Sequence, residues 1–329
     1  MSVHSSVAAD AELQAQRSQA GRWIGFGIAA AALMVVIAFY VGSDEVLAYA
    51  HRLTPELIAV LLGLSLVNYA MRAWRWDVYA RQRRVRIPFL RHSLYYVAGF
   101  ALTVTPGKLG ELLRLWLMRE GDGQPYARTL PLLVADRLAD SLALLVMACV
   151  GIVTLQGGLM SAIIPAAVFI LGSWWLGTRP RLIMGAVFSV QRRLGRGRSS
   201  VRKLHRLACE VAHLLRSGPF LFGLVLSLLG WFAEAAALWW LLHSLDADLP
   251  LFIVVFIFAA SMLAGAAAML PGGLGGAEIS MVALLVAFGV ASEPGIIATA
   301  LIRLTTLWFA VGLGFLLLPV AMRVARQRR

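Results

Sequence analysis

Apolar stretches about as long as a membrane span recur along this chain of 329 residues, among them 23–41, 56–77 and 219–243. A helix needs about 20 apolar residues to cross the hydrocarbon core of a bilayer, and it pairs its own backbone N–H and C=O groups as it does so. Of the residues, 60% are hydrophobic and only 14% are charged. These features exclude a soluble globular chain and predict an all-α polytopic membrane protein.

Two apolar stretches are interrupted where an intact span is expected. We name them the first broken segment, 89–119, and the second broken segment, 251–291. Interrupted helices survive at membrane depth only where protein or water covers their unpaired backbone groups. The recurrence favours two re-entrant helical hairpins over short exposed loops, although 251–270 alone is long enough to cross and an eight-span arrangement stays open. The interruptions are Pro106-Gly107 and Pro271-Gly272-Gly273.

The net charge of +13 is concentrated in segments that flank the apolar runs. This distribution follows the positive-inside bias of cytoplasmic loops and argues against nucleic acid as a partner. Ten Lys and Arg residues lie between Arg179 and Arg216 against the single acid Glu210, and 201–216 has the partial helical periodicity of a helix lying on anionic headgroups. We predict a cytoplasmic (inner) membrane protein with both termini in the cytoplasm. A second cytoplasmic marker is the arginine cluster that ends the run 56–77, namely Arg72, Arg75, Arg81, Arg83, Arg84 and Arg86.

The chain is expected to form a single transmembrane domain, 23–320, between an N-terminal tail, 1–22, and a basic C-terminal tail, 321–329. No small-residue cleavage site closes the run 23–41, so this run is predicted to be an anchor rather than a signal peptide. We predict about six full spans plus the two re-entrant hairpins. The spans are about 23–41, 56–77, 130–155, 159–177, 219–243 and 295–320.

Two parts of the chain match at a nearly constant offset. Repeat one covers about 56–155 and repeat two about 219–320, with a connector span and basic loop at 156–218. The charge rule directs 56–77 inward and 219–243 outward, which predicts an inverted repeat of the kind found in transporters. The matching pairs are Trp74 and Trp239 and Pro106 and Pro271, each 165 apart, Arg137 and Arg303, 166 apart, and Glu111 and Glu278, 167 apart.

Each interruption precedes the expected start of a short helix. Gly107 and Gly272 permit backbone conformations that other residues resist, and helix N-termini favour a phosphate or a carboxylate. Lys108 adds a full positive charge in the first copy, whereas Gly273 takes its place in the second. The two sites are therefore not expected to be equivalent.

Four charged residues recur in the two repeats. Glu111 and Glu278 fall in the first turn of the short helices, where they can cap free N–H groups, pair with an internal arginine or carry protons. Arg137 and Arg303 can each neutralise a glutamate of the facing hairpin, or hold a lipid phosphate through two hydrogen bonds.

Other polar residues lie inside single spans. Asp136 and Asp140 are four positions apart and share one helical face. Glu234 lies well inside the run 219–243 and is a candidate proton or cation site. Tryptophans such as Trp76 and Trp231 are expected to mark membrane interfaces. The predicted substrate-binding and translocation residues are Pro106, Gly107, Lys108, Glu111, Arg114, Asp136, Arg137, Asp140, Glu234, Pro271, Gly272, Gly273, Glu278 and Arg303.

The motifs TPGKLGELLR (105–114), ADRLADSL (135–142) and LPGGLGGAE (270–278) resemble the transmembrane region of lysylphosphatidylglycerol synthases, and the resemblance covers about 20–320. That family includes stand-alone flippase-like membrane proteins. In the synthases this region is thought to translocate the aminoacylated lipid, while a separate soluble catalytic domain makes it. No such domain is expected here, since the chain ends at Arg329. The resemblance thus implies flipping without synthesis, and it does not name the cargo.

We expect a lipid transporter or flippase for an anionic or zwitterionic phospho- or polyprenyl-linked lipid. One alternative is an intramembrane lipid-modifying transferase, in which Asp136, Asp140 and Glu111 bind a divalent ion or act as acid and base. Another is a non-catalytic membrane partner of a lipid-synthesis enzyme. Because no nucleophile or metal motif is found, we expect no catalytic residue, metal or cofactor. The expected partners are the membrane lipid, anionic headgroups at the basic loop, and either a homo-oligomer or a lipid-synthesis enzyme.

Overall fold

The computed structural model describes residues 52–105, 109–155, 198–268 and 270–327, together with the isolated positions 172, 175 and 179. Every regular element in these ranges is helical, which confirms the prediction of an all-α chain. In chain order the elements are α3 (Pro55–Gln82), α4 (Phe89–Ala98), η1 (Gly99–Leu102), α5 (Leu109–Asp122), α6 (Tyr126–Leu155), α9 (Arg198–Leu215), α10 (Gly218–Ser244), α11 (Leu251–Ala267), η3 (Pro271–Gly273), α12 (Gly276–Ala287), α13 (Ser292–Arg303), the π-helical turn η4 (Leu304–Trp308) and α14 (Phe309–Arg326).

Within the described part of the chain, three helices are long and apolar enough to cross a membrane, namely Pro55–Gln82, Gly218–Ser244 and the continuous run Ser292–Arg326. They coincide with three of the predicted spans, and α6 covers a fourth. The predicted spans 23–41 and 159–177 lie outside the described ranges.

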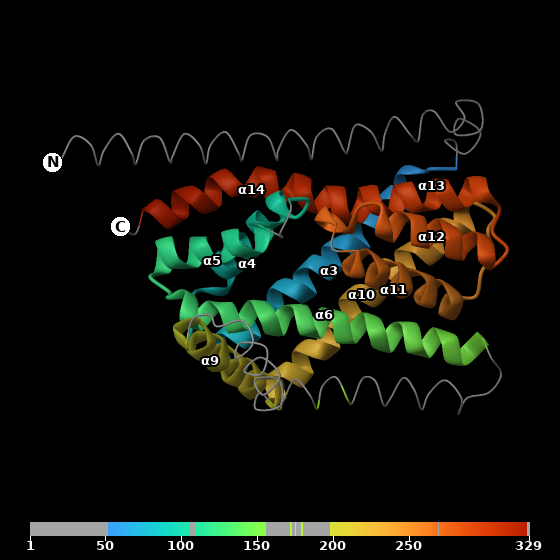
Figure 1. Ribbon diagram of the computed structural model, residues 1–329. Coiled ribbons are helices and arrows are strands. Elements are labelled where there is room, and N and C mark those ends of the chain that lie inside the picture. The colour runs from blue at the N-terminus through green and yellow to red at the C-terminus, as the bar shows by residue number, and fades with distance from the viewer. Residues whose placement is uncertain are drawn as a thin grey trace.

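The helices α3 and α10 begin in the same way and pack against each other. Thr54 caps α3 by accepting a hydrogen bond from the N–H of Leu57 at 3.2 Å, and Ser217 caps α10 by accepting one from Phe220 at 3.3 Å. A proline stands in the first turn of each helix, where backbone N–H groups have no acceptor within the helix, so the missing N–H of proline costs no hydrogen bond. These two helices make the most extensive helix–helix contact among the described elements and lie in the middle of the molecule (Figure 1).

The two broken segments lie toward opposite ends of the molecule. Figure 1 shows α6 and the run from α13 to α14 extending along opposite sides, with α4 and α5 near one end and α11 and α12 near the other. The first broken segment contains α4, η1 and α5, and the second contains α11, η3 and α12. With 17 residues in α11 and 12 in α12, both helices of the second segment are shorter than a typical span.

Buried apolar side chains form two separate cores. The aromatic core contains Trp76, Tyr79 and Tyr96, and it joins α3, α4, α5 and α14 to the first half of α6. The aliphatic core contains mainly Leu, Ile, Val and Ala, including Leu238 and Ile257, and it joins α10, α11, α12 and α13 to the second half of α6. Each broken segment is therefore packed into a core of its own.

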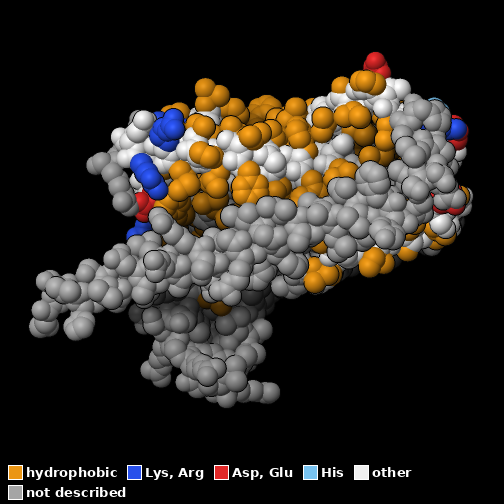
Figure 2. All heavy atoms as spheres, turned by 90° about the horizontal axis from the view of Figure 1, so that it is seen from above, with side chains coloured by type: hydrophobic (Ala, Val, Ile, Leu, Met, Phe, Trp, Pro, Cys, Tyr) orange, Lys and Arg blue, Asp and Glu red, His pale blue; other side chains and the backbone are white. Residues whose placement is uncertain are grey.

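The outer surface is strongly apolar. Leu90, Ile279 and Leu316 are 83%, 72% and 73% exposed, respectively. Figure 2 shows hydrophobic side chains over the middle of the visible face and charged side chains toward its two ends. Soluble monomers rarely expose contiguous apolar surface on this scale, so the surface is suited to lipid.

Glycines let the two arms of each broken segment approach closely. A Cβ atom on Gly99 would lie 2.8 Å from the carbonyl oxygen of Gly110, and a Cβ atom on Gly110 would lie 3.0 Å from the carbonyl carbon of Leu102. In the second segment, a Cβ atom on Gly276 would lie 3.2 Å from the Cα atom of Gly265. Larger residues at these positions would push the arms apart.

The substitution Gly110→Ala is expected to lower the free energy of unfolding by about 1–3 kcal/mol, the usual cost of overpacking. The added methyl group meets backbone atoms of Gly99 and Leu102, which cannot rotate away. Gly63→Ala is the matched control, because a Cβ atom at Gly63 in α3 meets nothing within 4 Å and alanine favours a helix. Thermal unfolding in detergent measures both, and equal melting temperatures for the two variants would contradict the expectation.

Candidate functional site

A cavity of about 280 Å³ opens between the two broken segments. Glu111 of the first segment and Gly272 of the second both line it, as do side chains of α3, α6, α10 and the run from α13 to α14. Phe100 from the aromatic core and Leu144 from the aliphatic core face the same space, so the cavity lies where the two cores meet. Its charged lining residues are Arg72, Glu111, Arg114, Arg137, Asp140, Glu234 and Arg303.

The two aspartates of α6 are held by arginines of α3. Arg75 is fully buried, and it donates from Nε to Asp136 Oδ1 at 2.9 Å and from Nη1 to Asp140 Oδ1 at 2.6 Å. Arg72, one turn earlier on α3, donates to Asp140 Oδ2 at 3.1 Å. The predicted shared face of the two aspartates is therefore present. Charge-assisted hydrogen bonds of this kind compensate carboxylates that are removed from water.

Arg72 and Arg75, which were counted in the predicted cytoplasmic arginine cluster, are internal. Both lie inside the apolar run 56–77, and the guanidinium groups point at α6 rather than at an aqueous loop. Their spacing of three positions was the available signal, because it places them on one face of the helix opposite the aspartate pair.

Two tryptophans expected at membrane interfaces are internal. The indole N–H of Trp231 donates to Asp140 Oδ1 at 3.0 Å, and its ring lines the cavity. Trp76 is 1% exposed and donates to Nε2 of His92 at 3.0 Å. Aromatic rings in spans also pack and donate hydrogen bonds internally, and composition alone does not separate the two cases.

Each repeated arginine pairs with the glutamate of one broken segment. Arg137 Nη1 lies 3.3 Å from Glu111 Oε1. Arg303 donates from Nε to Glu278 Oε1 at 2.6 Å and from Nη2 to the carbonyl oxygen of Gly272 at 2.9 Å. Both glutamates stand in the first turn of their helices, as predicted. Of the roles weighed for them, pairing with an internal arginine is the one observed.

The second broken segment has the backbone geometry that its glycines allow. Gly272 and Gly273 have φ angles of 63° and 70°, a region that residues with a Cβ rarely adopt. This turn exposes the carbonyl oxygen of Gly272 to the guanidinium of Arg303. The expectation for Gly272 is therefore confirmed.

Directly after Arg303 the helix passes through the π-helical turn η4. The hydroxyl of Tyr69 on α3 donates to the backbone carbonyl of Thr306 within this turn. Both side chains line the cavity. Short π-turns inside long helices are frequent at functional sites.

Arg114 and Glu234 line the cavity without a salt bridge to any described residue. Arg114 is 3% exposed and its guanidinium lies 3.7 Å from the ring centre of Tyr96 and 5.3 Å from that of Phe100. Glu234 is 5% exposed in the middle of α10. These two groups are thus buried charges without an ion-pair partner among the described residues.

The structure brings most of the predicted site residues together. Eight line the cavity, namely Glu111, Arg114, Arg137, Asp140, Glu234, Gly272, Gly273 and Arg303. Asp136 and Glu278 stand behind this lining, held by ion pairs, and Pro271 opens η3 beside it. Pro106, Gly107 and Lys108 lie outside the described residues.

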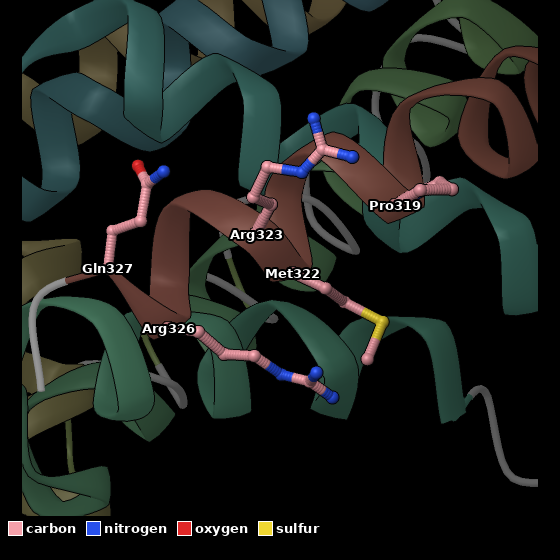
Figure 3. A pocket seen from close by; sticks show the side chains of 5 residues that line it. All are labelled: Pro319, Met322, Arg323, Arg326 and Gln327. Atoms are coloured by element: carbon pink, nitrogen blue, oxygen red, sulfur yellow. The ribbon is translucent and has the colours of Figure 1, made fainter.

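A second hollow lies on the surface of α14. It is a groove of about 440 Å³ lined by Pro319, Met322, Arg323, Arg326 and Gln327, and Figure 3 shows that Arg323 and Arg326 extend from the helix in different directions. All five residues come from one end of one helix, and the two arginines are exposed. The central cavity, with opposite charges from several helices, is therefore the stronger candidate site.

Comparison with known proteins places the chain among membrane proteins. The family described as "Lysylphosphatidylglycerol synthase TM region" matches residues 22–314. Two UPF0104 membrane proteins of Methanothermobacter thermautotrophicus are similar, one 23% identical over 86% of this chain and 88% of the relative, the other 24% identical over 90% and 94%. A UPF0104 membrane protein of Pyrococcus horikoshii is 21% identical over 87% of this chain and 93% of its own length.

Proposed function

This chain belongs to the family of the lysylphosphatidylglycerol synthase transmembrane region and is a multi-pass integral membrane protein, and on that premise we propose that it is a lipid carrier. It moves an anionic or zwitterionic phospho- or polyprenyl-linked lipid between the leaflets of the cytoplasmic membrane. The headgroup enters the central cavity while the acyl or prenyl chains stay in the bilayer. The observation that carries this proposal is the cavity itself, whose charged lining comes from both repeats.

The proposal includes an inverted repeat with six spans and two re-entrant hairpins. The pair of Arg137 with Glu111 and the pair of Arg303 with Glu278 support it, because the two pairs occupy corresponding positions, one within each repeat. The glycine contacts add a match that the hydropathy does not contain. Gly99 and Gly265 are 166 positions apart, as are Gly110 and Gly276. Gly99 lies against Gly110 in the first broken segment, and Gly265 lies against Gly276 in the second, so each contact brings together the two arms of one segment. The short length of α11 favours a hairpin over an eighth span.

Transport by such a carrier requires that the cavity open alternately to the two leaflets. The aromatic and aliphatic cores flank the cavity, so one core can rock against the other while the packing inside each is kept. The π-helical turn η4 lies between the cavity-lining Arg303 and α14, where such a movement would bend the long helix. These features support rocking of two halves about the headgroup site.

Orientation follows from the basic end of the molecule. Glu210 of α9 forms an ion pair with Arg83 at the end of α3, so the described part of the basic loop lies beside the arginine-rich end of that span. We propose that this end is cytoplasmic, that both termini lie there, and that anionic headgroups contact α9. The membrane domain then covers 23–320.

A carrier fits the acidic residues better than a transferase. Glu111, Asp136 and Asp140, which were the candidates for acid–base or metal chemistry, are each in contact with at least one arginine. A carboxylate held in this way serves to balance buried arginines. We therefore propose no catalytic role for them.

Leaflet transfer in proteoliposomes tests the carrier. Fluorescent phosphatidylglycerol, phosphatidylethanolamine and a polyprenyl phosphate are placed in separate vesicles with the purified protein, and external quenching reports the rate at which each lipid leaves the inner leaflet. At least one lipid is expected to cross clearly faster than in protein-free vesicles. Rates equal to the protein-free rate for the whole panel would overturn the proposal.

A further inference from the structure

The charges in and directly behind the cavity are equal in number but incompletely paired. Among the described residues these are five arginines and five carboxylates. Four of the arginines form ion pairs with four of the carboxylates, which leaves one cation and one anion, Arg114 and Glu234. The paired groups are Arg72, Arg75, Arg137 and Arg303 with Glu111, Asp136, Asp140 and Glu278.

Arg114 is fixed in place by aromatic rings rather than by a carboxylate. Its guanidinium carbon lies within 6.0 Å of the ring centres of Tyr96, Phe100 and Trp76. The nitrogens Nε and Nη1 are buried without a hydrogen-bond partner in the described part of the chain. Gly99 provides the room, because a Cβ atom there would lie 2.6 Å from the Cγ and Nε atoms of Arg114. The aromatic rings therefore position the guanidinium of Arg114, and its N–H groups remain available to donate hydrogen bonds to a ligand.

Glu234 stands on α10, in the other repeat. No described side chain donates a hydrogen bond to it, and Arg72 and Arg303, whose positive charges act on it, are already held by Asp140 and Glu278. A buried carboxylate without a donor is costly, which is why acids inside membrane spans usually mark substrate or ion sites.

The two unpaired groups belong to different elements of one cavity. Arg114 is fixed on the side of the aromatic core, and Glu234 lies on α10 near Tyr69 and Arg303. The volume of about 280 Å³ leaves room for a small polar headgroup.

We propose that the cavity selects a zwitterionic headgroup, whose phosphate binds Arg114 and whose ammonium binds Glu234; this inference rests on the proposed function. An anionic headgroup without an amine satisfies Arg114 but leaves Glu234 unpaired beside a second negative charge. A cationic headgroup without a phosphate leaves Arg114 unpaired in the same way. Only a headgroup that carries both charges pairs with Arg114 and with Glu234. The other two classes of headgroup each leave one buried charge uncompensated, and this cost makes them bind less tightly.

Binding of three short-chain lipids to the full chain in maltoside micelles tests the inference. The probes are dioctanoyl phosphatidylethanolamine, its N-acetyl derivative, which keeps the phosphate and loses the ammonium, and a dioctanoyl trimethylammonium lipid without phosphate. Native mass spectrometry counts bound lipid at each concentration. The first probe is expected to bind about tenfold more tightly than either of the others, because each of the others lacks one charge-assisted contact.

Two variants test which residue binds the ammonium of the headgroup and which binds its phosphate. Glu234→Gln is expected to abolish the preference for the ammonium probe over its N-acetyl derivative, and to raise the affinity for the derivative, because the uncompensated carboxylate is removed. Arg114→Gln is expected to lower the affinity for both phosphate-containing probes about tenfold, and Arg114→Lys is expected to restore part of that affinity. Equal binding of the three probes by the native sequence, a comparison that needs no variant, would overturn the inference, and so would a preference that survives Glu234→Gln.

The same preparation separates this inference from the carrier proposal. Selective binding of the zwitterionic probe without leaflet transfer of any lipid supports the pairing and overturns the carrier. Leaflet transfer with no headgroup preference supports the carrier and overturns the pairing.

Discussion

The substitution Arg75→Met is expected to lower the free energy of unfolding by about 3–5 kcal/mol, the cost of removing one partner from a buried ion pair. Arg75 is fully buried between α3 and α6, and it also contacts Ser227 of α10. Without it, Asp136 and Asp140, which are 0% and 5% exposed, lose their shared donor. Thermal unfolding in detergent measures the loss.

Two further variants show whether the lost energy comes from this pairing. Arg326→Met changes an exposed arginine near the end of α14 and is expected to shift the free energy of unfolding by less than about 0.5 kcal/mol. The double variant Arg75→Met with Asp136→Asn is expected to be more stable than the single variant, because the uncompensated carboxylate is removed as well. A double variant that loses the sum of the two single losses would show that Arg75 and Asp136 do not act together.

The substitution Arg303→Ala is expected to reduce leaflet transfer to the protein-free rate. Arg303 holds the glutamate of α12 and the turn before it at once, through Glu278 and the carbonyl oxygen of Gly272. Its loss leaves a carboxylate and a backbone carbonyl unpaired at the wall of the cavity, which costs several kcal/mol. Transfer in proteoliposomes is measured beside the melting temperature, so that lost transfer is compared with lost folding.

Arg323→Ala is the matched control for this second substitution. Arg323 belongs to the same continuous helix, Ser292–Arg326, but it is exposed and lines only the surface groove of Figure 3. Its removal is expected to leave transfer unchanged. The double variant Glu278→Ala with Arg303→Ala is expected to transfer no more slowly than either single variant, since the two residues act as one unit. Equal losses for Arg303→Ala and Arg323→Ala would argue that surface charge, and not the cavity, controls transfer.

The long helices could be predicted because length, apolar composition and capping agree. The runs 56–77 and 219–243 fall within α3 and α10, and each helix begins after a Thr or Ser cap and has a proline in its first turn. The broken segments were found for the opposite reason, since proline and glycine interrupt otherwise apolar stretches. Positional matching of the repeats then placed Glu111 and Arg137 in corresponding roles with Glu278 and Arg303, and the structure pairs them in that way.

The remaining part of the site depends on which face of a helix turns inward, and hydropathy does not contain that information. Arg72 and Arg75 followed the pattern of cytoplasmic marker residues, yet the rotation of α3 directs both at α6. Tyr69 and Trp231 sit in apolar runs where aromatic residues are common, so nothing in their local sequence indicated the cavity. Such contacts are set by tertiary packing.

The separate aromatic and aliphatic cores have a consequence for cooperativity. Apolar contacts within each core stabilise its own helices, while the interface between the cores consists partly of a polar cavity. We therefore expect the two cores to behave as two folding units joined mainly by α3, α6 and α10, which melt at different temperatures. A single melting temperature then describes the weaker unit, and a substitution in the stronger one becomes visible only after the first has opened.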